Sequence, residues 1–251
     1  MKDDVISLLK SIGTKIKKDR HFLTKDGTKI GSQLKTEADK LSHRLLVENL
    51  KVIKNIPIIS EEEKNSHKIK KNSYWMIDPI DGTSSLAEGY LGWVIQVALI
   101  EDNKVYFSAV HSPDLELTYY AILNEGAYLN EKRIKVSKSS TKRVLIDNYP
   151  KPKGIAKKIF DSLEFSDYVE SGSIGLKICR VAEGSANLFV KDVVVRDWDI
   201  LPPLLILSEA GGHLRKLDGT VYSLSEGIEK NGIIAASDYN YILKVIELTE
   251  D

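Results

Sequence analysis

A short apolar run at residues 74–77, which ends abruptly at an acid, constrains this chain more than any other feature. The run has the character of a strand; it stops at Asp78, a proline follows at once, and Asp81 comes just before a Gly-Thr pair. Proline fixes its own φ and Gly82 permits close backbone approach, so the loop is able to hold both carboxylates around one point. Converging carboxylates suit a hard cation such as Mg2+, which leaves room for a substrate phosphate. The alternative is a plain loop whose aspartates only cap a turn.

Two further acidic segments lie at the ends of predicted elements. Residues 57–59 form another short apolar strand, and Glu61, Glu62 and Glu63 follow it. Three adjacent glutamates repel one another, so either they lie in water at a helix start or at least one of them is held by a cation. Asp199 precedes an apolar segment with prolines in its first turn, which is an ordinary N-cap pattern. Such an acid is also able to aim its carboxylate at a shared centre.

In this order, three motifs resemble the inositol monophosphatase superfamily. They are S-E-E at residues 60–62, D-P-I-D-G-T at residues 78–83, and W-D at residues 198–199 with an apolar helix and A-G-G behind it. The superfamily contains Mg2+-dependent, lithium-sensitive phosphatases, among them the 3'(2'),5'-bisphosphate nucleotidases. The resemblance covers residues 35–212, and its specific part is D-P-I-D-G-T beside a downstream W-D. It implies a layered α/β, or α+β, fold: a five-layer αβαβα sandwich of the sugar-phosphatase type.

The resemblance also implies a set of metal ligands. The first Mg2+ ion is expected at Glu61, Asp78 and the carbonyl of Ile80, and the second at Asp78, Asp81 and Asp199. Two or three ions are expected in all. The charges agree with this assignment, because four carboxylates at one point repel one another strongly unless cations are present.

Catalytic roles follow from the resemblance for three residues. Asp39, taken alone, is an acid in the first turn of a helix, where the helix dipole stabilises it. In similar enzymes the corresponding acid hydrogen-bonds the threonine of D-G-T, so Asp39 and Thr83 are expected to orient the attacking water. Glu61 is expected to act through the first metal ion, which lowers the pKa of its bound water.

The substrate-binding residues expected here come from two helix starts. The amides of Gly82 and Thr83 are expected to hold the phosphate. Ser173 and Gly175 open a second helix, whose free N–H groups suit a hydroxylated or phosphorylated ligand. Lys177 resembles a lysine that is frequent in bisphosphate nucleotidases; the alternative is a solvated helix residue.

Composition limits the class of protein. The 251 residues are 42% hydrophobic, which is enough for one large or two interlocked lobes. Lysine plus arginine equals aspartate plus glutamate at 36 each, so we expect no nucleic acid polymer and no membrane as partner. Cys179, the single cysteine, excludes an internal disulfide and fits a reducing cytoplasm. We expect no signal peptide or membrane span; a homodimer is common among similar proteins and stays open.

Periodicity predicts a change of architecture near residue 137. The N-terminal part, residues 1–137, is expected to be an α+β lobe that carries most metal ligands. The C-terminal part, residues 138–251, is expected to be an α/β lobe with the last ligand and part of the substrate pocket. The predicted elements include helices at 5–20, 36–54 and 199–210, a meander of strands at 93–100, 105–111 and 116–123, strands at 144–147, 167–170 and 186–190, and a loop at 192–197.

These observations favour a metal-dependent phosphomonoesterase that hydrolyses a small phosphorylated metabolite by metal-activated water. Adenosine 3',5'-bisphosphate is the preferred substrate, and inositol 1-monophosphate is the alternative. A rival of another class is a catalytically weak regulatory or binding protein that kept the fold. A nucleotide-sugar transferase with a D-x-D loop is disfavoured, because Asp78 and Asp81 have the wrong spacing for it.

Overall fold

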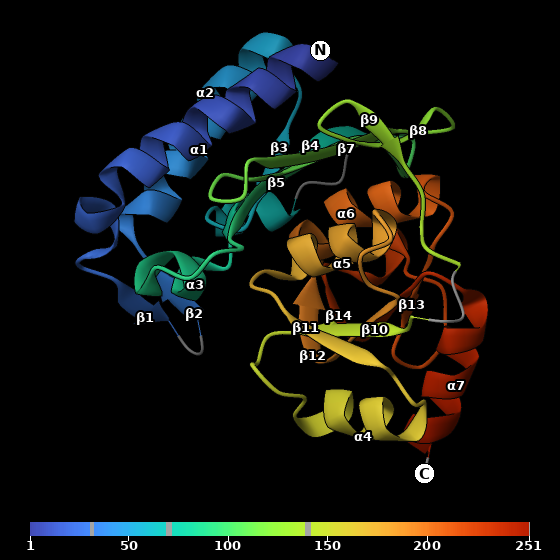
Figure 1. The fold of residues 1–251 in the computed structure, drawn as a ribbon. Coiled ribbons are helices and arrows are strands. Elements are labelled where there is room, and N and C mark those ends of the chain that lie inside the picture. The colour runs from blue at the N-terminus through green and yellow to red at the C-terminus, as the bar shows by residue number, and fades with distance from the viewer. Residues whose placement is uncertain (31–32, 69–71, 139–141, 251) are drawn as a thin grey trace.

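The computed structural model describes residues 1–30, 33–68, 72–138 and 142–250, and it stacks helices and sheets in five layers (Figure 1). A pair of helices covers one outer face, a second pair lies between the two sheets, and a third pair covers the other outer face. These pairs are α1 (Lys2–Thr24) with α2 (Glu37–Ile53), α5 (Ile174–Ala182) with α6 (Asp197–Glu209), and α4 (Gly154–Ser162) with α7 (Tyr239–Glu250). The predicted αβαβα sandwich is therefore confirmed.

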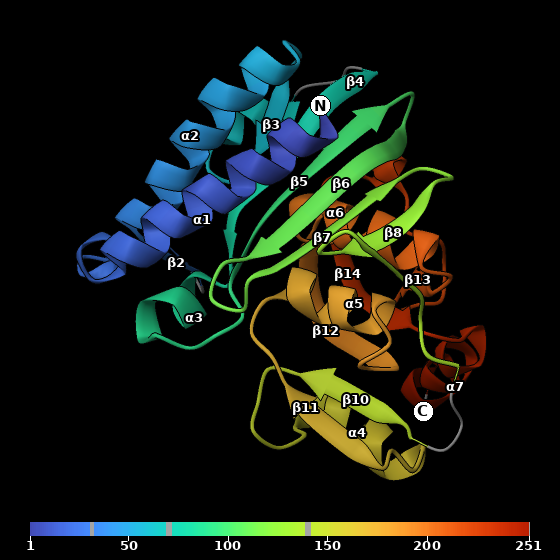
Figure 2. The same cartoon turned by 45° about the horizontal axis from the view of Figure 1, so that its top comes forward.

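The first large sheet has seven strands in the order β3-β4-β5-β6-β7-β8-β9. Only β3 and β4 run parallel within it, and the remaining neighbours are antiparallel, as the predicted meander requires. Figure 2 shows α1 and α2 side by side over one face of this sheet. The strands are β3 (Ile58–Ser60), β4 (Ser73–Asp81), β5 (Val94–Glu101), β6 (Lys104–Ser112), β7 (Leu117–Ile122), β8 (Gly126–Leu129) and β9 (Lys132–Ile134).

The second large sheet has five strands in the order β11-β10-β12-β14-β13. β10 runs parallel to both of its neighbours, and the pairs that include β14 are antiparallel. The strands are β10 (Val144–Asp147), β11 (Asp167–Glu170), β12 (Leu188–Arg196), β13 (His213–Lys216) and β14 (Glu229–Ala236). The remaining elements are the hairpin β1 (Thr28–Ile30) and β2 (Gln33–Lys35), the short helix α3 (Thr83–Glu88), and the 3-10 turns Lys64–Lys68 and Leu224–Glu226.

Side-chain alternation along β4 separates two of the cores. Trp75 and Ile77 belong to the apolar cluster under α1 and α2, whereas Tyr74 and Met76 belong to the cluster between the sheets. Successive strand residues point to opposite faces, so a single strand serves both layers. Helix α6 contacts both sheets from the middle layer, which is why most of its residues are buried.

Some element bounds differ from the prediction. β12 runs through residues 192–196, which were predicted as a loop, and a bulge between Lys191 and Val194 lets it keep pairing with β14. Three consecutive valines make this stretch favourable for a strand. The two sheets divide between Ile134 and Val144, but α6 packs on the first sheet, so separate lobes at 1–137 and 138–251 stay a prediction. Among the described helices, none has both the length and the apolar character that crossing a bilayer requires.

Candidate active site

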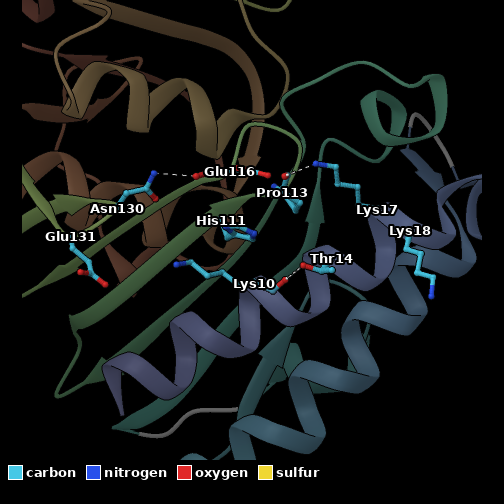
Figure 3. A pocket seen from close by; sticks show the side chains of 9 residues that line it. All are labelled: Lys10, Thr14, Lys17, Lys18, His111, Pro113, Glu116, Asn130 and Glu131. Atoms are coloured by element: carbon cyan, nitrogen blue, oxygen red, sulfur yellow. Dashed lines mark hydrogen bonds between the residues drawn. The ribbon is translucent and has the colours of Figure 1, made fainter.

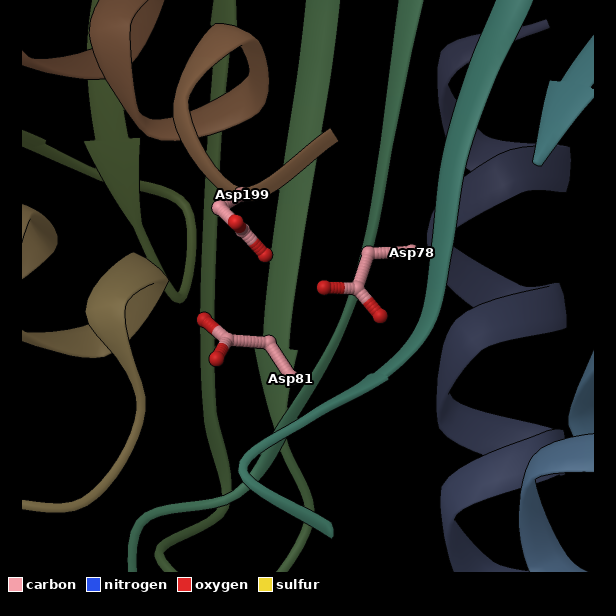
Figure 4. A group of neighbouring side chains, drawn as sticks. All are labelled: Asp78, Asp81 and Asp199. Atoms are coloured by element: carbon pink, nitrogen blue, oxygen red, sulfur yellow. The ribbon is translucent and has the colours of Figure 1, made fainter. Parts of the chain in front are cut away.

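Three aspartates meet at one end of the seven-stranded sheet. One carboxylate oxygen from each of Asp78, Asp81 and Asp199 lies within 4.8 Å of the other two. The first two side chains come from β4 and the third from α6, and Figure 4 shows the three carboxylates turned toward a common centre. The predicted convergence of these acids from distant parts of the chain is therefore present in the structure.

A bulge in β4 places Asp78 and Asp81 on the same face. In a regular strand, residues three apart point to opposite faces. Asp78 pairs with Gln96 of β5, and Asp81 pairs with Val94. Two residues of β4 lie between these pairs, opposite a single residue of β5. The extra residue restores the same side for both acids. The predicted loop after Asp78 is thus wrong in detail, because the strand continues to Asp81 through Pro79, whose missing N–H the bulge tolerates.

Asp199 is held by the first turn of α6. The helix starts at Asp197, two residues before the predicted start, so Asp199 is its third residue and not its N-cap. The carboxylate accepts a hydrogen bond from the backbone amide of Arg196, with N to Oδ2 at 3.0 Å, which completes half of a capping box. This bond restricts the orientation of the carboxylate that joins the cluster.

Glu61 follows β3 and lines the same cavity as the aspartates. The ammonium of Lys35, at the end of β2, lies 2.7 Å from Glu61 Oε1 and 2.5 Å from Glu62 Oε1. Burial lowers the pKa of Lys35, but the two carboxylates more than offset this effect, so its pKa is raised overall. The cation that holds the glutamates in this structure is therefore a lysine, which the sequence interpretation did not include.

The predicted pair of Asp39 and Thr83 is present. Thr83 Oγ1 donates to Asp39 Oδ1 at 2.7 Å, while Asp39 Oδ2 accepts from the amide and the hydroxyl of Thr36, both at 2.7 Å. Burial raises the pKa of Asp39, and the hydrogen bonds from Thr36 and Thr83 act against that rise. Asp39 therefore caps α2 and positions Thr83 at the same time.

A cavity of about 270 Å3 is lined by Glu61, Thr83 and the three aspartates, and lysines from the C-terminal half also line it. Lys177 of α5 is fully buried, so the alternative of a solvated helix residue is wrong. Its Nζ donates to the carbonyl of Gly172 at 2.5 Å and to Asn148 Oδ1. Burial lowers the pKa of Lys177 to about 7. Lys191, at the bulge of β12, and Asn148, just after β10, were missed, because only the packing of distant strands brings them here.

The two predicted helix starts differ in what their amides contact. Gly82, before α3, lines the cavity and has a positive φ of 92°. Ser173, before α5, also lines the cavity, and its Oγ caps α5 by accepting a hydrogen bond from the amide of Leu176. The amide of Gly175 donates to Asp81 Oδ2 at 2.6 Å. This amide holds a carboxylate of the cluster, so the ligand contact expected for Gly175 is not available in this arrangement.

A larger hollow of about 700 Å3 lies elsewhere, beside α1 (Figure 3). Its charged lining consists of lysines from α1 and two glutamates, and its histidine, His111, is buried with Nδ1 3.0 Å from Thr118 Oγ1. Size alone therefore does not identify the site. The grouped acids, Thr83 and Lys177 all line the smaller cavity.

Comparison with known proteins agrees with this geometry. A sequence model of the inositol monophosphatase family matches residues 4–250. The chain belongs to the inositol monophosphatase family. It is a phosphatase, and the 3'(2'),5'-bisphosphate nucleotidase CysQ of Haemophilus influenzae is 31% identical to it over 193 residues, which are 71% of this chain and 70% of that protein.

A curated relative and a solved structure from Thermotoga maritima are also similar to this chain. A fructose-1,6-bisphosphatase/inositol-1-monophosphatase is 29% identical over 217 residues, covering 84% of this chain and 83% of the relative. A solved structure of a T. maritima IMPase superposes with a TM-score of 0.85 at 26% identity, covering 99% of this chain and 97% of that one. The layered fold is thus shared over nearly the whole chain.

The electrostatics of this family site fit a hard divalent cation. Burial, with the neighbouring acids, raises the pKa of Asp78 and of Asp199, and burial raises that of Asp81 to about 6. Buried carboxylates that repel one another are stabilised when a cation neutralises them. The donors are oxygens throughout, as Mg2+ prefers, and the family is metal-dependent.

Proposed function

We propose that this phosphatase hydrolyses a phosphomonoester of adenosine 3',5'-bisphosphate with Mg2+. The observation that supports this substrate is the lining of the cavity, which combines the acid cluster with the lysines Lys177 and Lys191. A substrate with one phosphate needs charge neutralisation at one place, whereas a bisphosphate needs it at two. The nucleotidase name of the Haemophilus influenzae relative supports the same substrate.

Two or three Mg2+ ions are proposed for Glu61, Asp78, the carbonyl of Ile80, Asp81 and Asp199. Bound there, Mg2+ supplies a water of lowered pKa and neutralises charge on the phosphoryl oxygens. The protein contributes the oxygen donors, each fixed by its own element: the bulge of β4, the end of β3 and the first turn of α6. Donors that are held by separate packed elements limit the reorganisation that ion binding requires.

Thr83 and Asp39 are proposed to orient the attacking water. Because the Thr83 hydroxyl donates its hydrogen bond to Asp39, its oxygen is left to accept a hydrogen bond from water. A water held in this way keeps a lone pair available for attack on phosphorus. The amides of Gly82 and Thr83, at the start of α3, are proposed to hold the phosphate.

Lys177 and Lys191 are proposed to bind the second phosphate. Burial lowers the pKa of Lys177 to about 7, so a dianion beside it favours the charged form of its amine. The preference over inositol 1-monophosphate rests on these two cations. Similar kcat/KM values for the bisphosphonucleotide, inositol 1-phosphate and fructose 1,6-bisphosphate, measured with and without lithium, would contradict that preference.

A regulatory protein that kept the fold is the rival of another class. It is disfavoured because each of Glu61, Asp78, Asp81 and Asp199 is still an acid and three of them converge. Calorimetry that detects no Mg2+ binding, together with no turnover on the same three substrates, would favour it.

Replacing Lys191 by methionine is expected to lower kcat/KM for adenosine 3',5'-bisphosphate by roughly 10- to 100-fold, the scale of a hydrogen bond to a charged group. The decrease in kcat/KM for adenosine 3'-monophosphate, which lacks the second phosphate, should be much smaller. Phosphate release from both substrates measures the difference. The control is Lys104→Met, at the exposed start of β6, which should change neither value. Equal losses on both substrates would show that Lys191 does not bind the second phosphate.

Removing Mg2+ is expected to destabilise the protein more at neutral than at acidic pH. The pKa of Asp81 is about 6 in the folded chain, above its ordinary value, and those of Asp78 and Asp199 are also raised. A raised folded pKa contributes stability at low pH that is lost as pH rises through that pKa. The rise in Tm on adding Mg2+ to EDTA-treated protein should therefore be larger at about pH 7.5 than at about pH 5. Equal shifts at the two pH values would contradict this coupling.

A further inference from the structure

A second hollow of about 670 Å3 adjoins the catalytic cavity. Both are lined by Ser84 and Ser85 of α3, by Asn148 after β10, and by Gly172 after β11. A ligand that is held in the catalytic cavity is therefore able to extend directly into this outer hollow.

The outer hollow has an apolar ledge that nothing in the described chain covers. Tyr90, Leu91 and Tyr149 line it with 64%, 59% and 44% of their surface exposed. Single exposed apolar side chains are common on proteins, but three around one hollow beside an active site indicate a ligand-binding surface. Pro150 adds to the same ledge.

Backbone contacts between the two halves of the chain hold this ledge in place. The amide of Ser173 donates to the carbonyl of Gly92 at 2.9 Å, and a Cβ built on Gly92 would lie 2.9 Å from the amide nitrogen of Gly172. The amide of Tyr90 donates to the carbonyl of Ser85 at 2.9 Å. Figure 2 shows the chain between β11 and α5 reaching toward the segment after α3. The ledge is thus preformed, which reduces the entropy lost on binding.

The second tyrosine is oriented by a cation. Lys153 Nζ lies 4.6 Å from the ring centre of Tyr149, and the ring keeps a large exposed area. This contact favours the observed ring orientation and leaves the ring largely uncovered.

Charge divides the two cavities. The inner one is lined by Lys35, Lys177 and Lys191 together with the carboxylates of the proposed Mg2+ site, whereas the charged lining of the outer one is Glu88 and Glu170. With Mg2+ on the inner carboxylates, phosphate groups are attracted to the inner cavity and repelled from the ledge. The outer hollow suits an uncharged aromatic ring with a hydrogen-bond donor that one of these glutamates accepts.

We propose that Tyr90, Leu91 and Tyr149 form a subsite for an aromatic nucleobase that bears an amino group. The inference rests on the proposed function, because it places the base of the same substrate whose phosphates occupy the inner cavity. Stacking on these rings makes the ledge specificity-determining. An inositol or sugar phosphate has no aromatic ring and gains nothing there.

The test compares two substrates that differ only in the base. They are 2'-deoxyadenosine 3',5'-bisphosphate and its analogue with hydrogen in place of the base, and the readout is the ratio of their kcat/KM values for phosphate release. The ratio should be about tenfold or more in the wild-type enzyme, as base stacking on an aromatic residue implies. Tyr149→Ala should bring it close to one, and Tyr149→Phe should keep it. Tyr106→Ala, a partly exposed tyrosine outside both cavities, is the control.

Two results would overturn the subsite. One is a wild-type ratio near one with both substrates hydrolysed, which leaves the proposed function intact. The other is a Tyr149→Ala variant that retains the wild-type ratio and whose unchanged Tm shows that it is folded. If neither substrate is hydrolysed while inositol 1-phosphate is, the nucleotidase proposal itself fails, and the subsite fails with it.

Discussion

Asp81→Asn is expected to reduce Mg2+-dependent phosphate release by roughly 1000-fold or more. Asp81 belongs to the cluster in which three carboxylates lie within 4.8 Å, and it is buried. Asparagine keeps the size of the side chain but removes the charge that a hard cation requires. The loss of several kcal/mol of transition-state stabilisation corresponds to a rate effect of about this size. Phosphate release at saturating Mg2+ with adenosine 3',5'-bisphosphate measures it.

The same variant should keep its Tm in EDTA. Asparagine removes the carboxylate oxygen that accepts from the amide of Gly175, which lowers the stability of the folded state. It also removes a buried negative charge beside Asp78 and Asp199, which raises that stability and offsets the loss. Asp161→Asn, on the exposed side of α4, is the matched control and should change neither property. Full activity of Asp81→Asn would contradict the assignment of Asp81 as a metal ligand.

Thr83→Val is expected to lower kcat by roughly 100-fold or more, the scale at which positioned proton-transfer groups contribute. Valine keeps the shape of the side chain but cannot accept a hydrogen bond from water. It also leaves Asp39 Oδ1 without its buried donor, which should lower the free energy of unfolding by about 1–3 kcal/mol. Steady-state kinetics and urea unfolding measure the two effects.

Thr83→Ser is the matched variant, because it keeps the hydroxyl and loses only a methyl group. It should retain most of the activity, and neither variant should change the Mg2+ affinity measured by calorimetry. A Thr83→Val variant with normal kcat would show that the Thr83–Asp39 pair only stabilises the fold. A parallel loss in Thr83→Ser would point instead to packing around the residue.

The sequence predicted the layers and the converging acids better than it predicted how the acids are held. Apolar periodicity located α2 and the meander, and the capping residue Thr36 was correctly placed at the start of α2. Asp78, Asp81 and Asp199 were grouped through the resemblance of their motifs. Their convergence depends on packing between residues more than a hundred positions apart, which no local pattern shows.

The errors have local physical causes. Pro79 was taken to end a strand, but a bulge removes the need for its N–H, so β4 continues. Residues 192–197 were predicted as a loop, but the three valines at 193–195 favour a strand, and β12 stays paired with β14 up to Arg196. Lys35 and Lys191 were missed, because lysine side chains usually lie in water and only the tertiary fold turns these two toward the cavity.

The extra residue in β4 makes the active site depend on the shape of the backbone at one point. If residues 78–81 followed strict alternation at their present number, the carboxylate of Asp81 would face the hydrocarbon layer beneath α1 and α2, where Trp75 and Ile77 lie. Substitutions that keep the bulge therefore adjust the chemistry, whereas substitutions that straighten the strand exchange inside for outside.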